Sequence, residues 1–226
     1  MANDFLGNPL VDTDPALIAG IDDFVGGFLA YETRAETILA TAAAHPQAVM
    51  AQVYAGWLWM FLEAPEAASR ALPFLDAARA ALRTGSAPGH AREREQVALL
   101  ADWVAGDTAA VEARAAALVV RWPQDLAVVK LAQYLAFNRG DAPAMLRIIL
   151  AVLPAHAHNA HAHGMAAFAY EQAHRLDEAE ASARLALSLQ PREPWAQHAL
   201  ATCCSPAAGW TRGCASCRRS AAAGRG

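Results

Sequence analysis

Apolar residues recur at intervals of three and four from Asp14 onward, the spacing that places them on one face of an α-helix. No stretch alternates strictly between apolar and polar residues, as a half-buried strand would, so we expect an all-α chain without a sheet. Asp14 can cap a first helix, and Pro15 suits its first position. Pro73 should kink or break a later helix because it cannot donate to the preceding turn. The helices predicted before the first clear loop cover residues 15–28, 30–44, 48–63 and 66–82.

Glycine and proline residues recur at a regular spacing in the second half of the sequence. Gly106 and Gly140 lie 34 residues apart, and Pro123 and Pro191 lie twice that distance apart. A period of about 34 is that of the tetratricopeptide repeat, in which helix pairs stack to complete a shared core. Pro154 arrives three residues early and predicts a shortened second helix in the middle unit. The predicted units are Arg92–Asp125, Leu126–Asn159 and Ala160–Glu193.

This periodicity defines the expected fold class and domain organisation. We expect an all-α, right-handed superhelix of antiparallel helix pairs, a tetratricopeptide-like α-solenoid. The alternative is an alanine-rich helical bundle whose small residues fall on the same grid by chance. The clearest loop, at 84–89, is too short to separate independent domains. The predicted parts are a flexible N-terminus at 1–13, N-terminal helix pairs at 14–91, repeats at 92–201 and an irregular, disordered or frameshifted tail at 202–226.

Composition narrows the choice of partner and compartment. The chain is 55% hydrophobic with a net charge of −4, which argues against nucleic acid as a partner. No apolar run reaches the roughly 18 residues of a membrane span, and the first 15 residues lack a signal-peptide core. All four cysteines follow residue 200, so none can staple the body of the protein. We therefore expect a cytoplasmic protein without a membrane partner.

Several segments share the sequence pattern of one family. They are Arg92–Gln96, Trp103–Asp107, Arg121–Asp125, Gly164–Glu171, Leu176–Glu180 and Pro194–Ala201. Together they resemble the tetratricopeptide repeat protein 38 family, and the similarity covers roughly residues 14–201. The resemblance implies a helical repeat protein and supplies no catalytic residues to carry over.

The chain departs from that family after Ala201. The stretch from Thr202 to Cys214 breaks the helical pattern, and a Ser/Ala/Gly/Arg tail follows. Back-translation with GC-rich codons and a one-base shift yields a plausible helix, turn and second helix. Our hypothesis is that residues from Thr202 onward are frameshifted. The chain would then be a truncated, inactive copy that self-associates through an uncapped C-terminal repeat.

One dense histidine cluster could hold a metal. Its members are His156, His158, His161 and His163. Imidazole suits zinc, copper or nickel, but residues two apart on a helix point to nearly opposite sides. The plain interpretation is a polar loop between repeats; the alternative is a metal-binding helical protein or metalloenzyme. We predict no cofactor and find no catalytic motif, so enzymatic activity has no positive support in the sequence.

The function that the pattern favours is binding of a protein or peptide partner along a groove formed by the first helix of each repeat. Mixed polar and aromatic residues suit an extended or helical peptide. The plain alternative is that several of these side chains are buried between repeats. The side chains predicted to face the groove are Gln96, Trp103, Lys130, Tyr134, Asn138, His161, Glu171 and Gln172.

Overall fold

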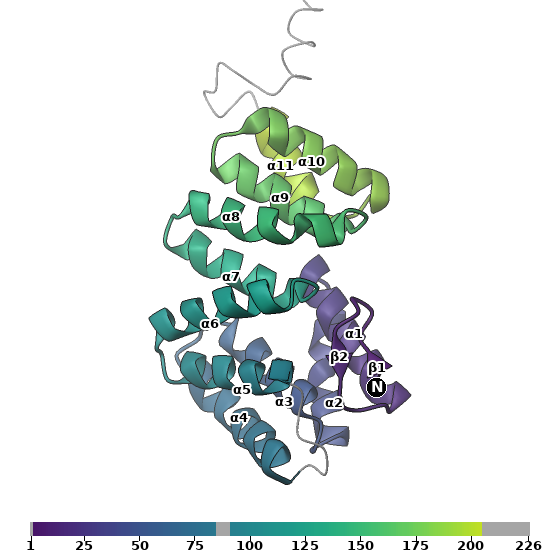
Figure 1. Ribbon diagram of the computed structural model, residues 1–226, viewed down its shortest axis with the longest axis vertical. Helices are drawn as coiled ribbons and strands as arrows, with labels where there is room; N and C mark the ends of the chain where they lie inside the picture. The colour runs from purple at the N-terminus through teal and green to yellow at the C-terminus, as the bar shows by residue number, and fades with distance from the viewer. Residues whose placement is uncertain (1, 85–90, 205–226) are drawn as a thin grey trace, which may run out of the picture. The chain divides into compact units, whose positions relative to one another are not determined.

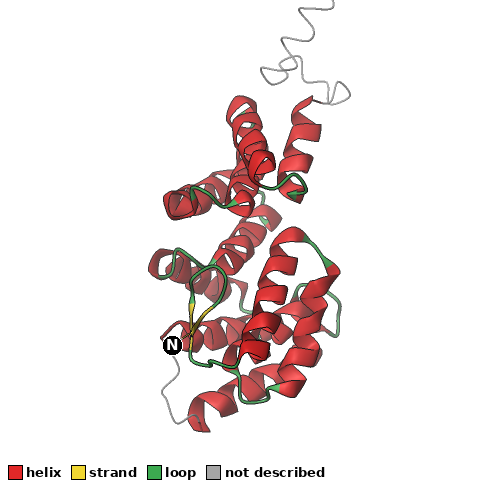
Figure 2. Ribbon diagram, turned by 90° about the vertical axis from the view of Figure 1, so that its right-hand side faces the viewer, coloured by secondary structure: helices red, strands yellow, loops and turns green. Residues whose placement is uncertain are grey.

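The computed structural model describes residues 2–84 and 91–204 of the 226-residue chain, and helices make up most of this part (Figures 1 and 2). An all-α fold class is therefore confirmed at this level. The chain divides into two compact units, Met1–Val128 and Val129–Gly226. We call them the N-terminal and C-terminal units and describe each by itself.

The N-terminal unit packs its helices around a large aromatic and aliphatic core. Helix α3 packs against α4 and α5, and α1 packs against α2 and α3. Phe24, Tyr54, Trp57 and Leu99 in this core are fully buried. The elements of the unit are β1 (Ala2–Asn3), β2 (Pro9–Leu10), α1 (Pro15–Ala30), the 3-10 helix η1 (Thr33–Thr37), α2 (Ile38–Ala44), α3 (Val49–Met60), α4 (Ala67–Thr84), α5 (Ala91–Val104) and α6 (Thr108–Arg121).

Most helix ends in this unit follow from local chemistry. The Asp14 side chain accepts from Ala16 N at 2.9 Å, so the predicted cap of α1 is confirmed. The single helix predicted over 30–44 is wrong, because Tyr31 adopts a left-handed backbone (φ 56°) that ends α1 before η1 begins. A break at Pro73 is also wrong: α4 continues through it. Pro73 lies on the exposed side of α4, where the Ser69 carbonyl that loses its partner can face solvent.

The N-terminus differs from the flexible segment predicted at 1–13. Strands β1 and β2 pair antiparallel, with Ala2 opposite Leu10, although no sheet was expected. The Asp4 carboxylate organises the connecting loop by accepting from Leu6 N at 3.0 Å and Asn8 N at 2.8 Å. These side-chain bonds stabilise the strand pair, and they do not require the alternation of apolar and polar residues by which strands are recognised in a sequence.

The C-terminal unit is built on alanine. Helices α9, α10 and α11 pack together, with α8 against α9 (Figure 1). Alanines at the contacts allow close helix approach, and each is fully buried: Ala167, Ala183, Ala186, Ala196 and Ala199. The elements that follow α6 in the chain are α7 (Leu126–Asn138), α8 (Ala142–Val152), the 3-10 helix η2 (Leu153–His156), α9 (Ala160–Gln172), α10 (Leu176–Leu189) and α11 (Pro194–Cys204).

The helix starts recur along the chain with a constant spacing. Helices α7, α9 and α11 begin 34 residues apart, as do α6, α8 and α10. In the turns that precede α6, α8 and α10, residues with left-handed backbone keep the same spacing: Gly106 (φ 75°), Gly140 (φ 71°) and His174 (φ 59°). We call α5, α7, α9 and α11 the first helices and α6, α8 and α10 the second helices. Their assembly into a right-handed superhelix stays a prediction.

The length of α8 and the end of α11 can be compared with the helix bounds expected from the sequence. Helix α8 has 11 residues and gives way to η2 at Pro154, whereas α6 and α10 have 14, so the shortened helix is confirmed. Helix α11 continues to Cys204, past the break expected after Ala201. The Cys203 side chain is 4% exposed and packs beside Ala179. Residues 205–226 of the predicted tail, like 85–90 of the predicted loop, lie outside the described residues.

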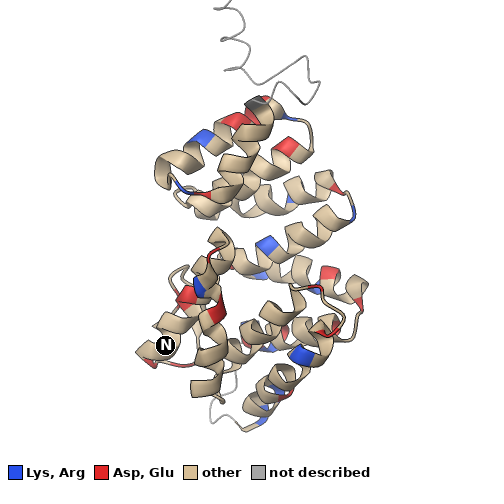
Figure 3. Cartoon of the chain, turned by 180° about the vertical axis from the view of Figure 1, so that it is seen from behind, with Lys and Arg blue, Asp and Glu red and all other residues tan. Residues whose placement is uncertain are grey.

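Charged residues are scattered along the helices, and most of the ribbon carries neither sign (Figure 3). In the two described stretches, no helix combines the length and the apolar character needed to cross a bilayer.

Candidate binding site

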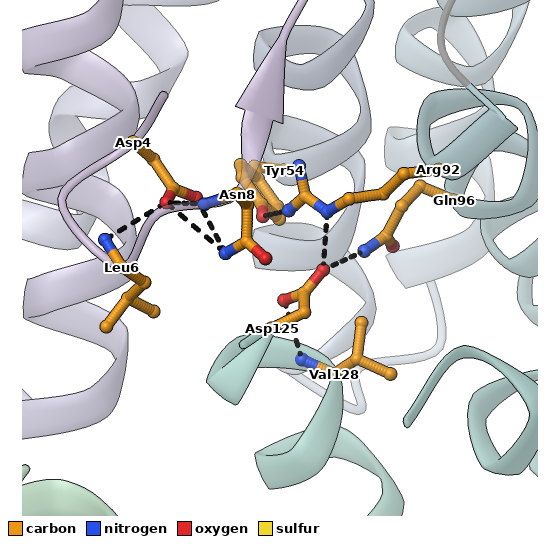
Figure 4. Close-up of polar contacts among 8 residues, drawn as sticks. All are labelled: Asp4, Leu6, Asn8, Tyr54, Arg92, Gln96, Asp125 and Val128. Atoms are coloured by element: carbon orange, nitrogen blue, oxygen red, sulfur yellow. Dashed lines mark hydrogen bonds and ion pairs between the residues drawn. The ribbon is translucent and has the colours of Figure 1, made fainter. Parts of the chain in front are cut away.

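Asp125 immediately precedes α7, and its carboxylate anchors a buried polar cluster (Figure 4). One oxygen, Oδ1, accepts from Val128 N at 3.3 Å and so caps the start of the helix. The other, Oδ2, accepts from Arg92 Nε and from Gln96 Nε2, both at 2.8 Å. Arg92 and Gln96 are fully buried, so the cap is held by α5 without help from solvent.

Arg92 extends this cluster to α3. Its Nη2 donates to the Tyr54 hydroxyl at 2.9 Å. Burial is the largest single effect on Arg92 and lowers its pKa, but the charge and hydrogen bond of Asp125, together with the interactions with Tyr54 and Asp4, outweigh it, so the pKa is raised. Burial raises the pKa of the Tyr54 hydroxyl as well. The guanidinium therefore stays charged and the phenol neutral at any physiological pH.

Two buried atoms of this cluster have no hydrogen-bond partner within the described residues. They are Arg92 Nη1 and Gln96 Oε1. An unmade hydrogen bond on a buried polar atom costs about 1–3 kcal/mol, so such atoms are rare in packed interiors. Within the described residues, the cluster therefore leaves the Nη1 amino group of Arg92 without an acceptor and the amide oxygen of Gln96 without a donor.

The hairpin formed by β1 and β2 lies over this cluster (Figure 4). Asp4 and Asn8 are 4% and 1% exposed, and Asn8 Nδ2 donates to Asp4 Oδ2 at 3.0 Å. Burial raises the pKa of Asp4, although the bonds from Asn8 and the charge of Arg92 oppose the shift. The Asp4 carboxylate accepts hydrogen bonds from Leu6 and Asn8 within the hairpin. It therefore acts on Arg92 through its charge and not through a hydrogen bond.

Two backbone amides and one apolar side chain help to attach the hairpin to the helices. Val11 N donates to Glu93 Oε1 on α5 at 3.2 Å, and Phe5 N donates to Asp22 Oδ1 on α1 at 2.9 Å. Leu10 adds an apolar anchor, since only 1% of it is exposed. The hairpin is therefore tied to α1 and α5 through its backbone and is buried at Asp4, Asn8 and Leu10.

The C-terminal unit contains an equivalent cap. Glu193 precedes α11, is fully buried, and its Oε2 accepts from Ala196 N at 2.6 Å. Its Oε1 lies 3.4 Å from His161 Nδ1. The carboxylate also passes close over Gly164, where any Cβ would overlap it. Any larger residue at position 164 would force the Glu193 carboxylate out of its capping position.

Lys130 interacts electrostatically with Glu193, and it is the only lysine in the sequence. It is 6% exposed. Burial lowers the pKa of Lys130 to about 7, and the charge of Glu193 opposes the shift. The side chain therefore changes charge near neutral pH.

Aromatic rings form a strip across three first helices of the C-terminal unit. Phe168 on α9 lies 5.5 Å from Phe137 on α7, 4.2 Å from Trp195 on α11 and 5.5 Å from His198 on α11. Phe137 is 44% exposed, His198 is exposed and Trp195 is half-buried. We call Phe137, Phe168, Trp195 and His198 the aromatic strip. Phe137 and His198 present ring surface to solvent, whereas Phe168 is buried between them.

The structure separates the residues predicted to face a groove into two groups. Gln96, Lys130 and His161 are buried, so the expectation that they contact a partner directly is corrected. Gln96 is used instead in the Asp125 cluster, and His161 lies against Glu193.

The remaining predicted groove residues reach the surface to different degrees. Trp103 is half-buried and packs on Trp57 and Phe61, with ring centroids 6.2 and 4.8 Å apart. Asn138 is exposed. The other three are half-buried: Tyr134, Glu171 and Gln172.

The histidine cluster does not converge on one point. His161 faces Glu193, and His163 Nε2 lies 2.9 Å from the Ala157 carbonyl. His156 is buried and His158 is exposed. Across residues 2–84 and 91–204, no three His, Cys, Asp or Glu side chains group as metal ligands.

Sequence reasoning missed the buried caps. A usable signal exists, because the polar residues Asp125, Asn159 and Glu193 stand 34 residues apart, each directly before a first helix. Asn159 also caps its helix, accepting from His161 N at 2.9 Å. Polar residues at helix starts are strong cap candidates. The sequence signal for Arg92 was present too, but charged runs at helical spacing usually mark a solvated face.

Comparison with known proteins places the chain in no family. No protein-family model, curated protein or solved structure matches it.

Proposed function

We propose that this chain is a tetratricopeptide-like helical-repeat scaffold, of the kind found in the tetratricopeptide repeat protein 38 family, that binds a peptide or protein partner. The 34-residue recurrence of helix starts and of left-handed turns supports the repeat assignment. Scaffolds of this class expose a surface built from equivalent helices of successive repeats.

The observation that carries the proposal is the aromatic strip. It is contributed by three successive first helices, and both Phe137 and His198 are open to solvent. Aromatic side chains at a surface anchor partners, because they bury a large area at a small cost in conformational entropy. The polar residues Asn138, Glu171 and Gln172 on the same first helices would supply hydrogen bonds to a peptide backbone.

Selection from a displayed random-peptide library tests this function. Peptides enriched on the immobilised chain are labelled, and their dissociation constants are measured by fluorescence anisotropy. The Phe137→Ala/His198→Ala double variant should weaken binding at least about tenfold, the loss expected when anchor residues are truncated. The matched control is Leu150→Ala/Leu185→Ala, which removes two exposed apolar side chains from the second helices α8 and α10.

The control should bind as the parent chain does. Failure to select any peptide, or equal losses in the two double variants, would overturn the proposal. The metal-binding alternative has no comparable support among the described residues.

A further inference from the structure

We propose that the N-terminal unit binds a small arylalkylammonium ion, an aromatic ring joined by a short chain to a cationic amine, in an apolar cavity beside η1. The cavity is lined by residues of η1, of α2, of the C-terminal end of α3 and of the turn that follows α3. They are Glu36, Leu39, Leu58, Trp59 and Leu62. We call it the Trp59 cavity. It belongs to the other unit from the aromatic strip, so it adds a small-molecule site to the proposed peptide-binding function.

The size of the Trp59 cavity suits a ligand with a single ring. Its volume is about 210 Å³. An engineered apolar cavity of about 150 Å³ in another protein holds benzene, whereas sites for drug-sized ligands begin at about 300 Å³. A phenyl group with a short side chain therefore fills the cavity, and a larger ring system would extend out of it.

Apolar side chains form the walls of the cavity. Leu39, Leu58 and Trp59 are half-buried, and Leu62 is 59% exposed. Arg70 does not line the cavity, but its Cζ lies over the Trp59 ring, 5.3 Å from the ring centroid, where a cation–π contact holds the indole in place. A ring bound in the cavity would remove its own apolar surface and that of these walls from water.

Glu36 determines the charge of the ligand. Among the described residues that line the cavity, it alone is charged. Its carboxylate is exposed and has no ion pair or hydrogen bond within the described part of the chain. The nearby Arg34 is paired with other carboxylates, at 2.6 Å with Glu32 and at 3.6 Å with Asp23. A cationic group at the mouth of the cavity would pair with Glu36, whereas an anionic group would be repelled.

The lining favours a free amine over a peptide. An extended peptide needs partners for its main-chain N–H and C=O groups. Apart from the Glu36 carboxylate and the Trp59 indole N–H, the side chains that line the cavity carry no polar atom. A small amine needs one acceptor for its charged group, and Glu36 supplies it.

The test titrates 2-phenylethylamine into the full, ¹⁵N-labelled chain and follows it by two-dimensional NMR. The amide signals of Glu36, Leu39, Leu58 and Leu62 and the indole signal of Trp59 should shift to saturation. A dissociation constant of about 1 mM is expected for a ligand of this size. The uncharged analogue 2-phenylethanol should bind about threefold more weakly, since an exposed ion pair contributes little. The anion 3-phenylpropanoate should bind at least about tenfold more weakly than the amine.

Two pairs of variants separate the charge from the walls. Glu36→Gln should abolish the preference for the amine over the alcohol. Its matched control, Glu32→Gln, removes an equal charge that bonds Arg34 outside the cavity and should keep the preference. Leu62→Ala removes part of a wall and should weaken the binding of amine and alcohol alike, by about threefold. Its control, Leu72→Ala, removes an exposed leucine of α4 outside the cavity and should bind as the parent does.

Four results would each overturn the inference: shifts that do not saturate, shifts that lie mainly outside the lining residues, equal affinity for amine and alcohol, or equal behaviour of the Glu36→Gln and Glu32→Gln chains. Circular dichroism of each variant ensures that the compared chains are folded. Peptide selection on the aromatic strip concerns residues of the other unit. Failure of either experiment therefore leaves the other proposal standing.

Discussion

The carboxylates that cap α7 and α11 occupy equivalent places in the 34-residue pattern, yet different side chains hold them. Asp125 is clamped by Arg92 and Gln96 through two bonds of 2.8 Å. Glu193 lies 3.4 Å from the His161 imidazole and interacts electrostatically with Lys130. The first cap is thus held by a group that keeps its charge at every physiological pH.

The second cap has a neighbour that titrates near neutrality, because burial lowers the pKa of Lys130 to about 7. The capping carboxylate is therefore stabilised by a permanent charge in the N-terminal unit. In the C-terminal unit the charge beside the equivalent carboxylate depends on pH. The comparison teaches that the helical pattern specifies where a buried carboxylate stands, while the residues of the preceding helices decide how it responds to solvent conditions.

The largest expected effect is in the N-terminal unit. Arg92→Met leaves the buried Asp125 carboxylate without its counter-charge, which should lower the free energy of unfolding by about 3–5 kcal/mol. Urea denaturation followed by circular dichroism measures the loss. Arg114→Met is the control: Arg114 bonds Asp102 at 2.7 Å and Glu95 at 2.9 Å but is 32% exposed, so under about 1 kcal/mol is expected. Equal losses would show that burial of the Arg92 pair has no special weight.

A smaller loss should follow from filling the space beneath the second cap. Gly164→Ala places a Cβ against the Glu193 carboxylate and should cost about 2–3 kcal/mol through overpacking and a displaced cap. Glu193→Ser keeps a capping oxygen on a shorter side chain. In that background, adding Gly164→Ala should cost little more, whereas strictly additive losses in a double-mutant cycle would contradict the close contact.

The pH response should distinguish the two caps. Lys130 has a folded pKa of about 7, below its unfolded value, so the unfolded state binds more protons above neutrality and stability rises with pH. The parent chain should gain about 2 kcal/mol between pH 7 and 9, and Lys130→Met should abolish this gain. Arg92→Met should retain the slope. A slope that persists in Lys130→Met would assign the response to another group.

The smallest effect concerns the hairpin over the first cap. Burial raises the pKa of Asp4, so its contribution to docking is complete below its ordinary value and is lost as pH rises through the folded value. Arg92 attracts the ionised form and Asp125 repels it. Asp4→Asn should tighten the docked hairpin at pH 7 by less than about 1 kcal/mol. Hydrogen exchange at Asn8 and Leu10 should slow relative to the parent at pH 7 and match it at pH 4.

The helical framework could be predicted from sequence because its signals are local. The start of α1 follows from Asp14 and Pro15, and the recurring turns follow from Gly106 and Gly140. The third turn was harder to find, since His174 adopts the same left-handed backbone without being glycine.

The clusters could not be predicted in the same way, because their contacts join residues far apart in the chain. Arg92 and Asp125 are separated by 33 residues, and Val11 and Glu93 by 82. The charged run around Arg92 is typical of a solvated face, and only the packing of α3, α5 and the hairpin buries it. The hairpin itself depends on the side-chain bonds of Asp4, which leave no periodic pattern in the sequence.

The burial of Lys130 has a practical consequence for chemical labelling. Since the sequence has no other lysine, Lys130 is the single side chain that an amine-directed acylating reagent can modify. Only 6% of Lys130 is exposed. Modification of Lys130 would require local opening of the C-terminal unit. The modification rate, measured by mass spectrometry, therefore reports how often that unit opens locally. Lys130 is thereby a residue-specific probe of the rate of local unfolding in the C-terminal unit.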